Sequence, residues 1–457
     1  MLLSLGVISC TALFAKPVAD SLSLHQAIAL TLAHYPAIQS KQALIKAGEA
    51  AITDVKHNWY PALKLHEQVN AGTDNGIYGS YFTMGMIPST SGGIRANNSD
   101  QLMSGNIAMA EMQWEIYNFG AYGSQRQAAQ SALHAEQADL DNTANQLTAT
   151  VIQDYLELLR LYELRKIQED NIRRTAEVQR AVTAIVLHGL KPGVDSAIAA
   201  AELSKARLNL LDVINQYNQV RIHLATLTGL DTALVRPDTA NGARLIGMLN
   251  AGDTMDTAMS SHPMLQYYEA LYQRQRAEEK VIRKKDLPKV SLLAAGWMRG
   301  SSGSFNDYYD KNLWSGLGYS RRNYLLGVGI TYNLVDIKHT RDKLAVQRYK
   351  SAAAQHDLET TRNTLDGLLQ QSRADILTSR DKLKELPLQL GAARAAAVQK
   401  MALYKAGLTN IIEVTNALFV LNRAETDLVQ TRDAAWKALF RAAYANNSLS
   451  QLLPELN

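Results

Sequence analysis

The sequence predicts a mainly α-helical protein that also carries four β-strands and is built from two tandem copies of one unit. Three observations predict this fold class. Long stretches with little proline repeat apolar residues at spacings of three and four, as coiled-coil helices do. Four stretches of about ten residues alternate apolar and polar side chains, which is typical of strands with one apolar face. Matching segments also recur in the same order at constant offsets.

The composition excludes several classes of protein. A length of 457 residues would ordinarily indicate about three domains. The net charge of +4 is small and evenly spread, which argues against a nucleic-acid binder. A single cysteine excludes an internal disulfide framework and a CxxC metal or redox site. No stretch after the N-terminus reaches the ~18 consecutive apolar residues of a transmembrane helix.

Residues 1–15 form a short apolar segment that ends in a small residue and precedes a polar one. They resemble the hydrophobic region and cleavage site of a secretory signal peptide, although the usual basic n-region is missing. We expect cleavage after Ala15. The run Val7–Cys10 also resembles a lipobox, in which Cys10 would be lipidated, and a retained apolar N-terminus is a third reading. Either processed form would be exported across an inner membrane.

The internal repeat divides the chain. Matches at an offset of 227 pair His34–Gln39 with Ser261–Gln266 and Tyr60–Leu63 with Leu287–Val290. Matches at an offset of 218 pair Trp114–Asn118 with Tyr332–Asp336 and His188–Leu190 with Ala406–Leu408. The first copy therefore has a loop nine residues longer between these elements. We expect a first copy at 16–230, a linker at 231–253, a second copy at 254–447 and a tail at 448–457.

Each copy begins with helices and two strands. Ser23 can cap a helix that starts at Leu24, and the helix after it should end near Asn58–Pro61, because a residue before proline avoids the α region. The strands are expected at about 60–72 and 104–117 in the first copy, and at about 287–300 and 321–335 in the second.

The strands alternate well. In the first, Leu63, Leu65 and Val69 share one face, and Glu67 is the exception on it. In the fourth, Tyr324, Leu326, Val328 and Ile330 face away from Asn323, Gly327 and Gly329. This pattern suits the wall of a membrane barrel and a soluble β-sandwich equally.

Long helix hairpins follow at 118–230 and 336–447. Apolar seams run through them; their members are Leu140, Ala144, Leu147, Val151, Tyr155, Leu158 and Tyr162 in the first, and Leu365, Leu369, Ser372, Ile376, Ser379, Leu383, Leu386 and Leu390 in the second. A helix of nearly 70 residues would span roughly 100 Å, too long for a compact domain. Pro387 should kink the second long helix.

Four strands cannot close a barrel, since about eight is the practical minimum, and lipid tolerates no open strand edge. If these strands lie in a membrane, the chain must therefore oligomerise. Two copies would supply eight strands and three copies would supply twelve.

These features together resemble the TolC family of outer-membrane efflux proteins, from about Leu22 to Ala445. The resemblance also rests on the Tyr-Pro-x-Leu segment before the first strand, on Ile116–Gly120 before the first long helix, and on the twin turns at Gly189 and Gly407. It implies a homotrimer with a twelve-stranded outer-membrane β-barrel, a periplasmic α-barrel of long helices and a mixed equatorial belt, in which the 231–253 linker would lie.

The resemblance also implies roles for the turns. Gly189 and Leu190 in the first turn, and Gly407 and Leu408 in the second, would form the periplasmic tip and contact an adaptor protein. Both glycines also fit ordinary helix C-termini that need a left-handed residue.

Four further residues would form the periplasmic gate. Asp195 would bond Tyr404 and hold the tip shut, and Glu413, repeated three-fold, would form an acidic constriction. Asp195 also fits a first-turn acid that the helix dipole favours, and the two roles are compatible. The family often has a second acid where this chain has Asn416, and a basic residue where it has Thr409. A double acidic ring and a salt-bridge latch are therefore in doubt.

The expected function is that of a passive outer-membrane exit duct of a tripartite efflux system. Its partners would be two further copies of itself, an adaptor, an inner-membrane transporter and outer-membrane lipid, with no nucleic acid. A type I protein-secretion duct and a periplasmic coiled-coil scaffold remain as alternatives. No enzyme is expected, with no cofactor and no metal, because the ten histidines include no pair at helical ligand spacing.

Overall fold

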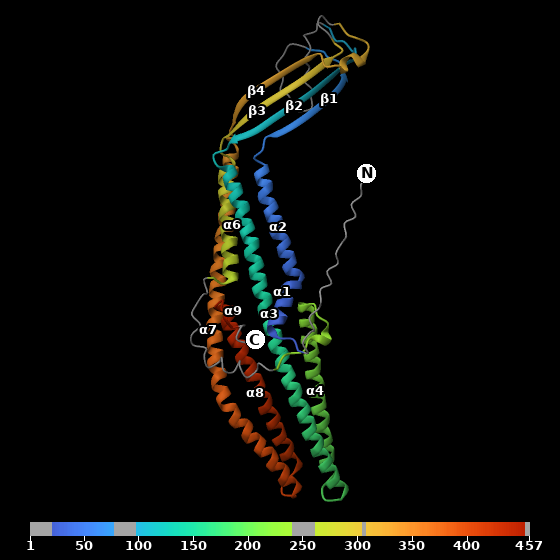
Figure 1. Ribbon diagram of the computed structural model, residues 1–457, viewed down its shortest axis with the longest axis vertical. Helices are drawn as coiled ribbons and strands as arrows, with labels where there is room; N and C mark the ends of the chain where they lie inside the picture. The colour runs from blue at the N-terminus through green and yellow to red at the C-terminus, as the bar shows by residue number, and fades with distance from the viewer. Residues whose placement is uncertain (1–20, 77–96, 240–260, 304–307, 453–457) are drawn as a thin grey trace, which may run out of the picture. The chain divides into compact units, whose positions relative to one another are not determined.

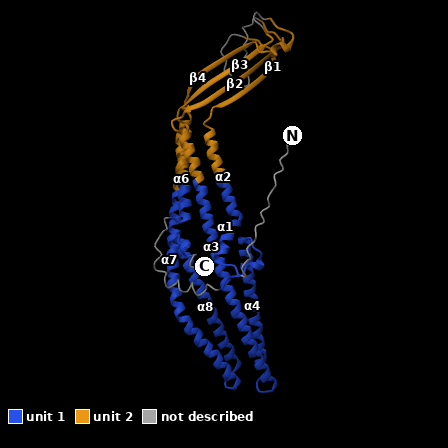
Figure 2. Cartoon of the chain, viewed as in Figure 1, with its two compact units in different colours: residues 1–46, 134–272, 353–457 blue, residues 47–133, 273–352 orange. Residues whose placement is uncertain are grey.

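The computed structural model describes residues 21–76, 97–239, 261–303 and 308–452 (Figure 1). The predictions at Cys10 and Ala15, and much of the 231–253 linker, lie outside these residues. The chain forms two compact units (Figure 2). The first comprises 1–46, 134–272 and 353–457, and the second comprises 47–133 and 273–352. Each unit draws on both tandem copies, so neither copy is a compact unit by itself.

Helices make up most of the described residues, and the predicted order of elements is confirmed. In the first copy they are α1 (Leu24–His34), α2 (Pro36–His57), α3 (Ala121–Leu187) and α4 (Gly193–Thr228), followed by the short η1 (Thr232–Leu234). In the second copy they are α6 (Pro263–Lys285), α7 (Asp336–Lys405), α8 (Ile411–Ala445) and α9 (Leu449–Leu452). Helix α7 continues through Pro387.

Local sequence signals explain where these helices begin and end. Ser23 and Gln26 form a reciprocal capping box at the start of α1, which satisfies two otherwise unpaired backbone donors. The turn before α3 has Phe119 at φ 51° and Gly120 at φ 81°. Asn118 closes this turn by accepting a hydrogen bond from the Tyr122 amide at 3.2 Å.

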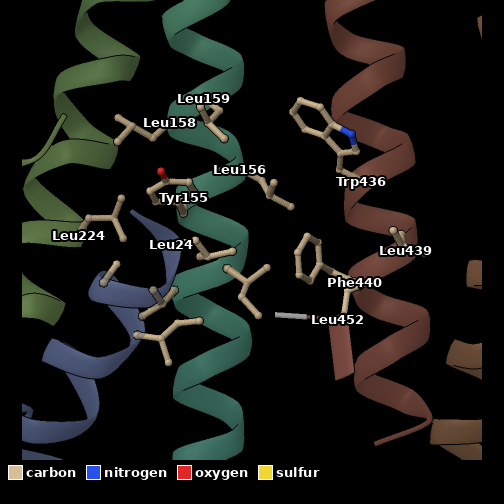
Figure 3. Close-up of a cluster of buried hydrophobic side chains, with 14 of the residues drawn as sticks. Leu24, Tyr155, Leu156, Leu158, Leu159, Leu224, Trp436, Leu439, Phe440 and Leu452 are labelled. Carbon is tan, nitrogen blue, oxygen red and sulfur yellow. The ribbon is translucent and has the colours of Figure 1, made fainter. Parts of the chain in front are cut away.

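The main core of the first unit forms around the middle of α3. Val151, Tyr155 and Leu158 of the predicted seam are buried. They pack with residues of α1, α4 and α8 that include Leu24, Leu224, Trp436 and Phe440 (Figure 3). The Tyr155 hydroxyl donates to the Leu22 carbonyl at 2.8 Å and accepts from the Asp238 amide at 3.0 Å. In α7 the seam residues Leu365, Leu369 and Ser372 are also buried.

The second unit contains one antiparallel sheet in the order β1-β2-β3-β4. Its strands are β1 (Ala62–Gly72), β2 (Met103–Tyr117), β3 (Lys289–Ser301) and β4 (Arg321–Thr331), and the short η4 (Leu313–Leu317) lies between the last two. All four predicted strands are present, with ends shifted by at most a few residues. The central pairing, β2 with β3, joins the two tandem copies.

The register places residues of like polarity in the same rows. Leu63 pairs with Met112, which pairs with Ala294 and then Leu326. Directly paired residues of an antiparallel sheet point to the same side, so these rows define one apolar face. We call it the apolar face. The row Lys64–Glu111 belongs to the opposite, polar face.

Among the described helices, none contains an apolar stretch that could cross a bilayer.

Candidate functional site

The two helix hairpins of the first unit end in turns of the same geometry. Gly189 has φ 71° and Gly407 has φ 78°, in the left-handed region that favours glycine. After α3, the Gly189 amide donates to the Val186 carbonyl at 2.9 Å and the Leu190 amide donates to the Ile185 carbonyl at 3.1 Å. After α7, Gly407 and Leu408 repeat both bonds at 3.0 and 2.9 Å. Both turns are therefore Schellman motifs.

Leucines project from both turns. In a Schellman motif the residue after the glycine often packs back on its own helix. Leu190 and Leu408 are instead 72% and 75% exposed. The same hydrophobic residue is thus presented to the outside at both hairpin ends.

Beyond the turns, Asp195 and Glu413 occupy the same third position of their helices. In α8 the Asn410 side chain caps the helix by accepting the Glu413 amide at 3.0 Å. In α4 the corresponding cap residue is Pro192, which offers no side-chain bond. A carboxylate in the first turn is favourable in both helices because it faces the positive end of the helix dipole.

Asp195 reaches across to the second hairpin. The Tyr404 hydroxyl of α7 donates a hydrogen bond to Asp195 Oδ2 of α4 at 3.2 Å. Tyr404 is only 1% exposed. Burial, followed by the hydrogen bond and charge of Asp195, raises the pKa of Tyr404 to about 12. The tyrosine therefore stays protonated and remains a donor over the whole neutral range.

An apolar cluster holds Tyr404 in place. Val178 and Val182 of α3, Ala199 of α4, and Ile411 and Val414 of α8 are buried around it. The ring is thereby fixed by all four long helices, and its hydroxyl reaches Asp195 at the edge of the cluster.

The structure adds Lys191 to this site, which the sequence interpretation missed. Its Nζ atom lies 5.7 Å from the centre of the Tyr404 ring, within the range of a cation–π contact. Lys191 follows Gly189 by two residues, as Thr409 follows Gly407. The basic residue that is missing after the second glycine is therefore present after the first, and comparing the two copies at this position would have found it.

Glu413 forms an ion pair with Lys400. Lys400 Nζ of α7 lies 2.9 Å from Glu413 Oε2, with both side chains partly exposed. Asn416 is exposed one turn further along α8. The structure thus brings Asp195 and Tyr404 together, whereas Glu413 forms an ion pair of its own and Asn416 adds no charge.

Sequence reasoning also missed a cluster of four charges between α3 and α8. Lys437 Nζ lies 2.6 Å from Glu157 Oε2 and 2.8 Å from Asp433 Oδ2, and Arg160 binds Glu157. Burial opposes the ionisation of Glu157, but the hydrogen bonds from Arg160 and Lys437 outweigh it and lower its pKa to about 2. Burial raises the pKa of Asp433.

Among the described residues, no group of three or more His, Cys, Asp or Glu side chains is placed to hold a metal ion.

The polar face of the sheet carries ion pairs between its strands. Glu111 Oε1 lies 3.5 Å from Lys64 Nζ and 3.4 Å from His66 Nε2. Lys289 Nζ lies 3.0 Å from Glu115 Oε2. These groups are partly exposed, so this face suits contact with water.

The sequence pattern of the outer membrane efflux protein family matches this chain at residues 27–230 and 254–443. The two matched ranges follow the two tandem copies. The chain therefore belongs to the outer membrane efflux protein family. Its location is the outer membrane, and members of this family are channels and not enzymes.

Two curated relatives share part of this sequence. The chain is 26% identical over 294 residues to protein CyaE of Bordetella pertussis, a match that covers 62% of this chain and 56% of CyaE. It is 25% identical over 197 residues to the pyoverdine export outer membrane protein OpmQ of Pseudomonas putida, covering 43% of this chain and 42% of OpmQ. The matched part thus spans about half the length of these relatives.

Solved structures share the fold over nearly the whole chain. The outer-membrane channel OprN is 18% identical with a TM-score of 0.72, and the match covers 93% of this chain and 90% of OprN. CusC is 13% identical with a TM-score of 0.74, covering 92% and 91%. The outer membrane protein VceC of Vibrio cholerae is 14% identical with a TM-score of 0.72, covering 92% and 95%.

Proposed function

We propose that three copies of this chain form a passive exit duct through the outer membrane. Small molecules would enter it from an inner-membrane transporter, with a periplasmic adaptor joining the two. The duct has no energy source in this proposal, because the transporter would drive export. The choice of substrate would then belong mainly to the transporter.

The apolar face of the sheet is the observation that carries this proposal. Leu65 of β1, and Tyr324 and Ile330 of β4, are each more than 70% exposed in the single chain. Fully burying one such side chain is worth about 1.5–3 kcal/mol, so a row of them in water is costly. Lipid removes this cost when the polar face, with Glu111 and Glu115, lines a water-filled lumen.

The edges of the sheet support oligomerisation. In the described chain, the outer sides of β1 and β4 pair with no further strand. Unpaired backbone groups cost several kcal/mol each in lipid, so β4 of one copy should pair with β1 of the next. Three copies would close twelve strands, as the family resemblance implies.

At the tip we propose that the bond between Tyr404 and Asp195 holds the closed state, with Lys191 supporting the ring. Glu413 would face the lumen, but Lys400 neutralises much of its charge and Asn416 adds none. The constriction would therefore be less acidic than one built from two rings of unpaired carboxylates.

The exposed Leu190 and Leu408 suit the adaptor contact. Their two turns share one geometry, so each copy would offer two equivalent apolar contacts, and a trimer would offer six. An adaptor with matching apolar pockets would cover them.

The test combines fractionation with conductance. We expect the protein in the outer-membrane fraction as a trimer that dissociates on heating, and the purified trimer should form discrete channels in planar bilayers. Recovery as a water-soluble monomer would contradict the duct and support the scaffold alternative, in which residues such as Ile330 and Trp114 would be buried in protein.

The secretion duct remains the second candidate within the family. The similarity to a pyoverdine export protein supports small-molecule cargo. Export assays with a siderophore and with a secreted polypeptide, each with its own transporter, would separate the two.

A further inference from the structure

The connection between β3 and β4 holds a tryptophan in an unusual position. Trp314 lies in η4 and is 79% exposed, whereas Gly316 in the same short helix is buried. The large Trp314 side chain is therefore exposed although the backbone of η4 packs against the rest of the protein.

Hydrogen bonds dock η4 on the sheet. Ser104 Oγ donates to the Leu313 carbonyl at 2.5 Å, and Asn106 Nδ2 donates to the Leu317 carbonyl at 2.7 Å. The Asn312 side chain accepts the Trp314 amide at 3.2 Å. Both ends of η4 are therefore fixed to β2.

Missing side chains make room for this docking. A Cβ atom on Gly300 of β3 would lie 1.6 Å from the Gly318 carbonyl oxygen. A Cβ atom on Gly316 would lie 2.1 Å from Ser104 Oγ and 2.6 Å from the Ser104 carbonyl oxygen. The backbones meet closely enough that only glycine fits at both positions.

The docked segment lies on the apolar face. Ser104 and Asn106 alternate along β2 with the same parity as Ala108 and Met112, and Asn106 pairs directly with Gly300. The Tyr319 hydroxyl, just after η4, donates to Glu67 Oε2 at 2.9 Å. Glu67 is the exception to the alternation of β1, and this bond gives it a partner.

The docked η4 lies at one end of the apolar face, along the direction of the strands. Along β4 the exposed residues Ile330, Val328, Leu326 and Tyr324 are followed on the same face by the exposed Arg322. The face thus changes from aliphatic to aromatic to charged within a few residues, and η4 lies in the charged and polar part.

We propose that η4 is a membrane-interface anchor that holds Trp314 in the headgroup layer of the outer leaflet. The proposal rests on the proposed function, because it needs the apolar face to contact lipid. Tryptophan prefers this layer, where its ring is in an apolar setting and its N–H reaches water. Arg322 of β4, on the same face of the sheet, would face the lipid phosphates.

The alternation decides between lipid and lumen. The ion-paired Glu111 and Glu115 lie on the opposite face from η4. A loop that folded into the lumen would have to lie on that polar face. Docking on the apolar face instead places Trp314 at the outer surface of the proposed barrel.

The test uses purified trimers in vesicles of phospholipids brominated either near the headgroup or near the chain end. Bromine quenches tryptophan fluorescence over a short range. The chain has five tryptophans, and Trp314→Phe removes only one of them. The emission of Trp314 is the difference between the unchanged protein and Trp314→Phe. Bromine near the headgroup should quench this emission more than bromine near the chain end. Trp436→Phe, at a buried site in the other unit, should leave lipid quenching unchanged.

A matched glycine pair tests the docking. Gly316→Ala should displace η4 and lose the shallow quenching of Trp314, whereas Gly318→Ala, whose Cβ would meet nothing within 4 Å, should retain it. Quenching of Trp314 by aqueous iodide alone would overturn the anchor. If the trimers that show iodide quenching are intact and conduct ions, the proposed duct is retained and only the anchor is rejected. Trimers that fail to insert into vesicles would count against both proposals.

Discussion

The contact between Tyr404 and Asp195 joins two hairpins that come from different copies of the repeat. The tyrosine is buried and the carboxylate is only partly so, which makes the bond stronger than an exposed one. Hydrogen bonds of this kind contribute about 1 kcal/mol or somewhat more. In a trimer the contribution would occur three times, enough to bias a gate without locking it.

Replacing Tyr404 with Phe should favour the open tip by about 1 kcal/mol per chain, because the ring stays packed while the hydrogen bond is lost. Single-channel recordings should show longer openings or higher conductance. Asp195→Asn should act in the same direction. Unchanged recordings in both variants would remove the gate role of this bond.

The raised pKa of Tyr404 gives the same prediction a pH dependence. The folded pKa is about 12, above the ordinary value of 10, so the stabilisation is fully present below pH 10. It should be lost as the pH rises from about 10 through 12. Tyr404→Phe should abolish this alkaline opening.

Single residues show where sequence reasoning stops. The pairing of Asp195 with Tyr404 was expected by resemblance, and the structure contains that bond, although its gating role is still a prediction. The ion pair between Lys400 and Glu413 was not expected. It joins residues thirteen apart across a turn, so no helical spacing marks it. Glu67 broke the strand pattern for a reason that only the partner Tyr319 reveals.

At the level of elements, the two Schellman turns repeat one geometry in the two copies. Each combines a left-handed glycine with two backbone bonds at nearly equal distances. Because no heavy atom lies within 4 Å of a Cβ placed on Gly189 or Gly407, the requirement for glycine there is one of backbone conformation alone.

Gly189→Ala or Gly407→Ala should therefore each destabilise the hairpin by about 1–2 kcal/mol, the cost of a left-handed conformation for a residue with a Cβ atom. Denaturant unfolding followed by helical circular dichroism would measure this. Gly391→Ala, in the interior of α7 with nothing within 4 Å of its Cβ, is the control. It should stabilise by roughly 0.5–1 kcal/mol, and equal destabilisation at both kinds of site would contradict the argument.

Most elements could be predicted from local patterns. Ser23 and Gln26 mark the start of α1, and the alternation in β4 marks its two faces. The short η4 could not be predicted, since its position depends on Gly300, Gly316 and Ser104 meeting in space. Sequence patterns indicate the periodicity and the caps of an element, but they do not indicate how a loop fits against a strand that is distant in the sequence.

For the molecule as a whole, the charge cluster of Glu157, Arg160, Asp433 and Lys437 links the first copy to the second inside one unit. Asp433 is buried, the other three side chains are partly buried, and the four pair with one another. Removing Lys437 would leave the buried Asp433 without its 2.8 Å partner, which is destabilising.

Stability of this unit should therefore fall in acid. Glu157 has a folded pKa of about 2 against an ordinary value of 4.5, so its contribution is complete above pH 4.5 and lost as the pH falls toward 2. The contribution is at most about 3 kcal/mol. The raised pKa of Asp433 has the opposite sign and offsets part of it. Acid unfolding of Glu157→Gln should show a weaker pH dependence in this range.

Asp170→Asn is the matched control, because Asp170 pairs with Arg173 at the surface. Exposed pairs contribute little, so this variant should unfold in acid as the unchanged protein does. An equally large effect of both substitutions would contradict the role of the partly buried charge cluster.

The sheet order has a consequence for biogenesis. Strand β2 ends at Tyr117 and its neighbour β3 begins at Lys289, so half of the sheet is translated well before the strand with which it pairs. Until β3 is made, the pair of strands β1 and β2 has an open edge on β2 and an uncovered apolar face. Because this central pairing joins residues far apart in the sequence, closing the sheet carries the loop-closure cost of a non-local contact, and the sheet should form late in folding.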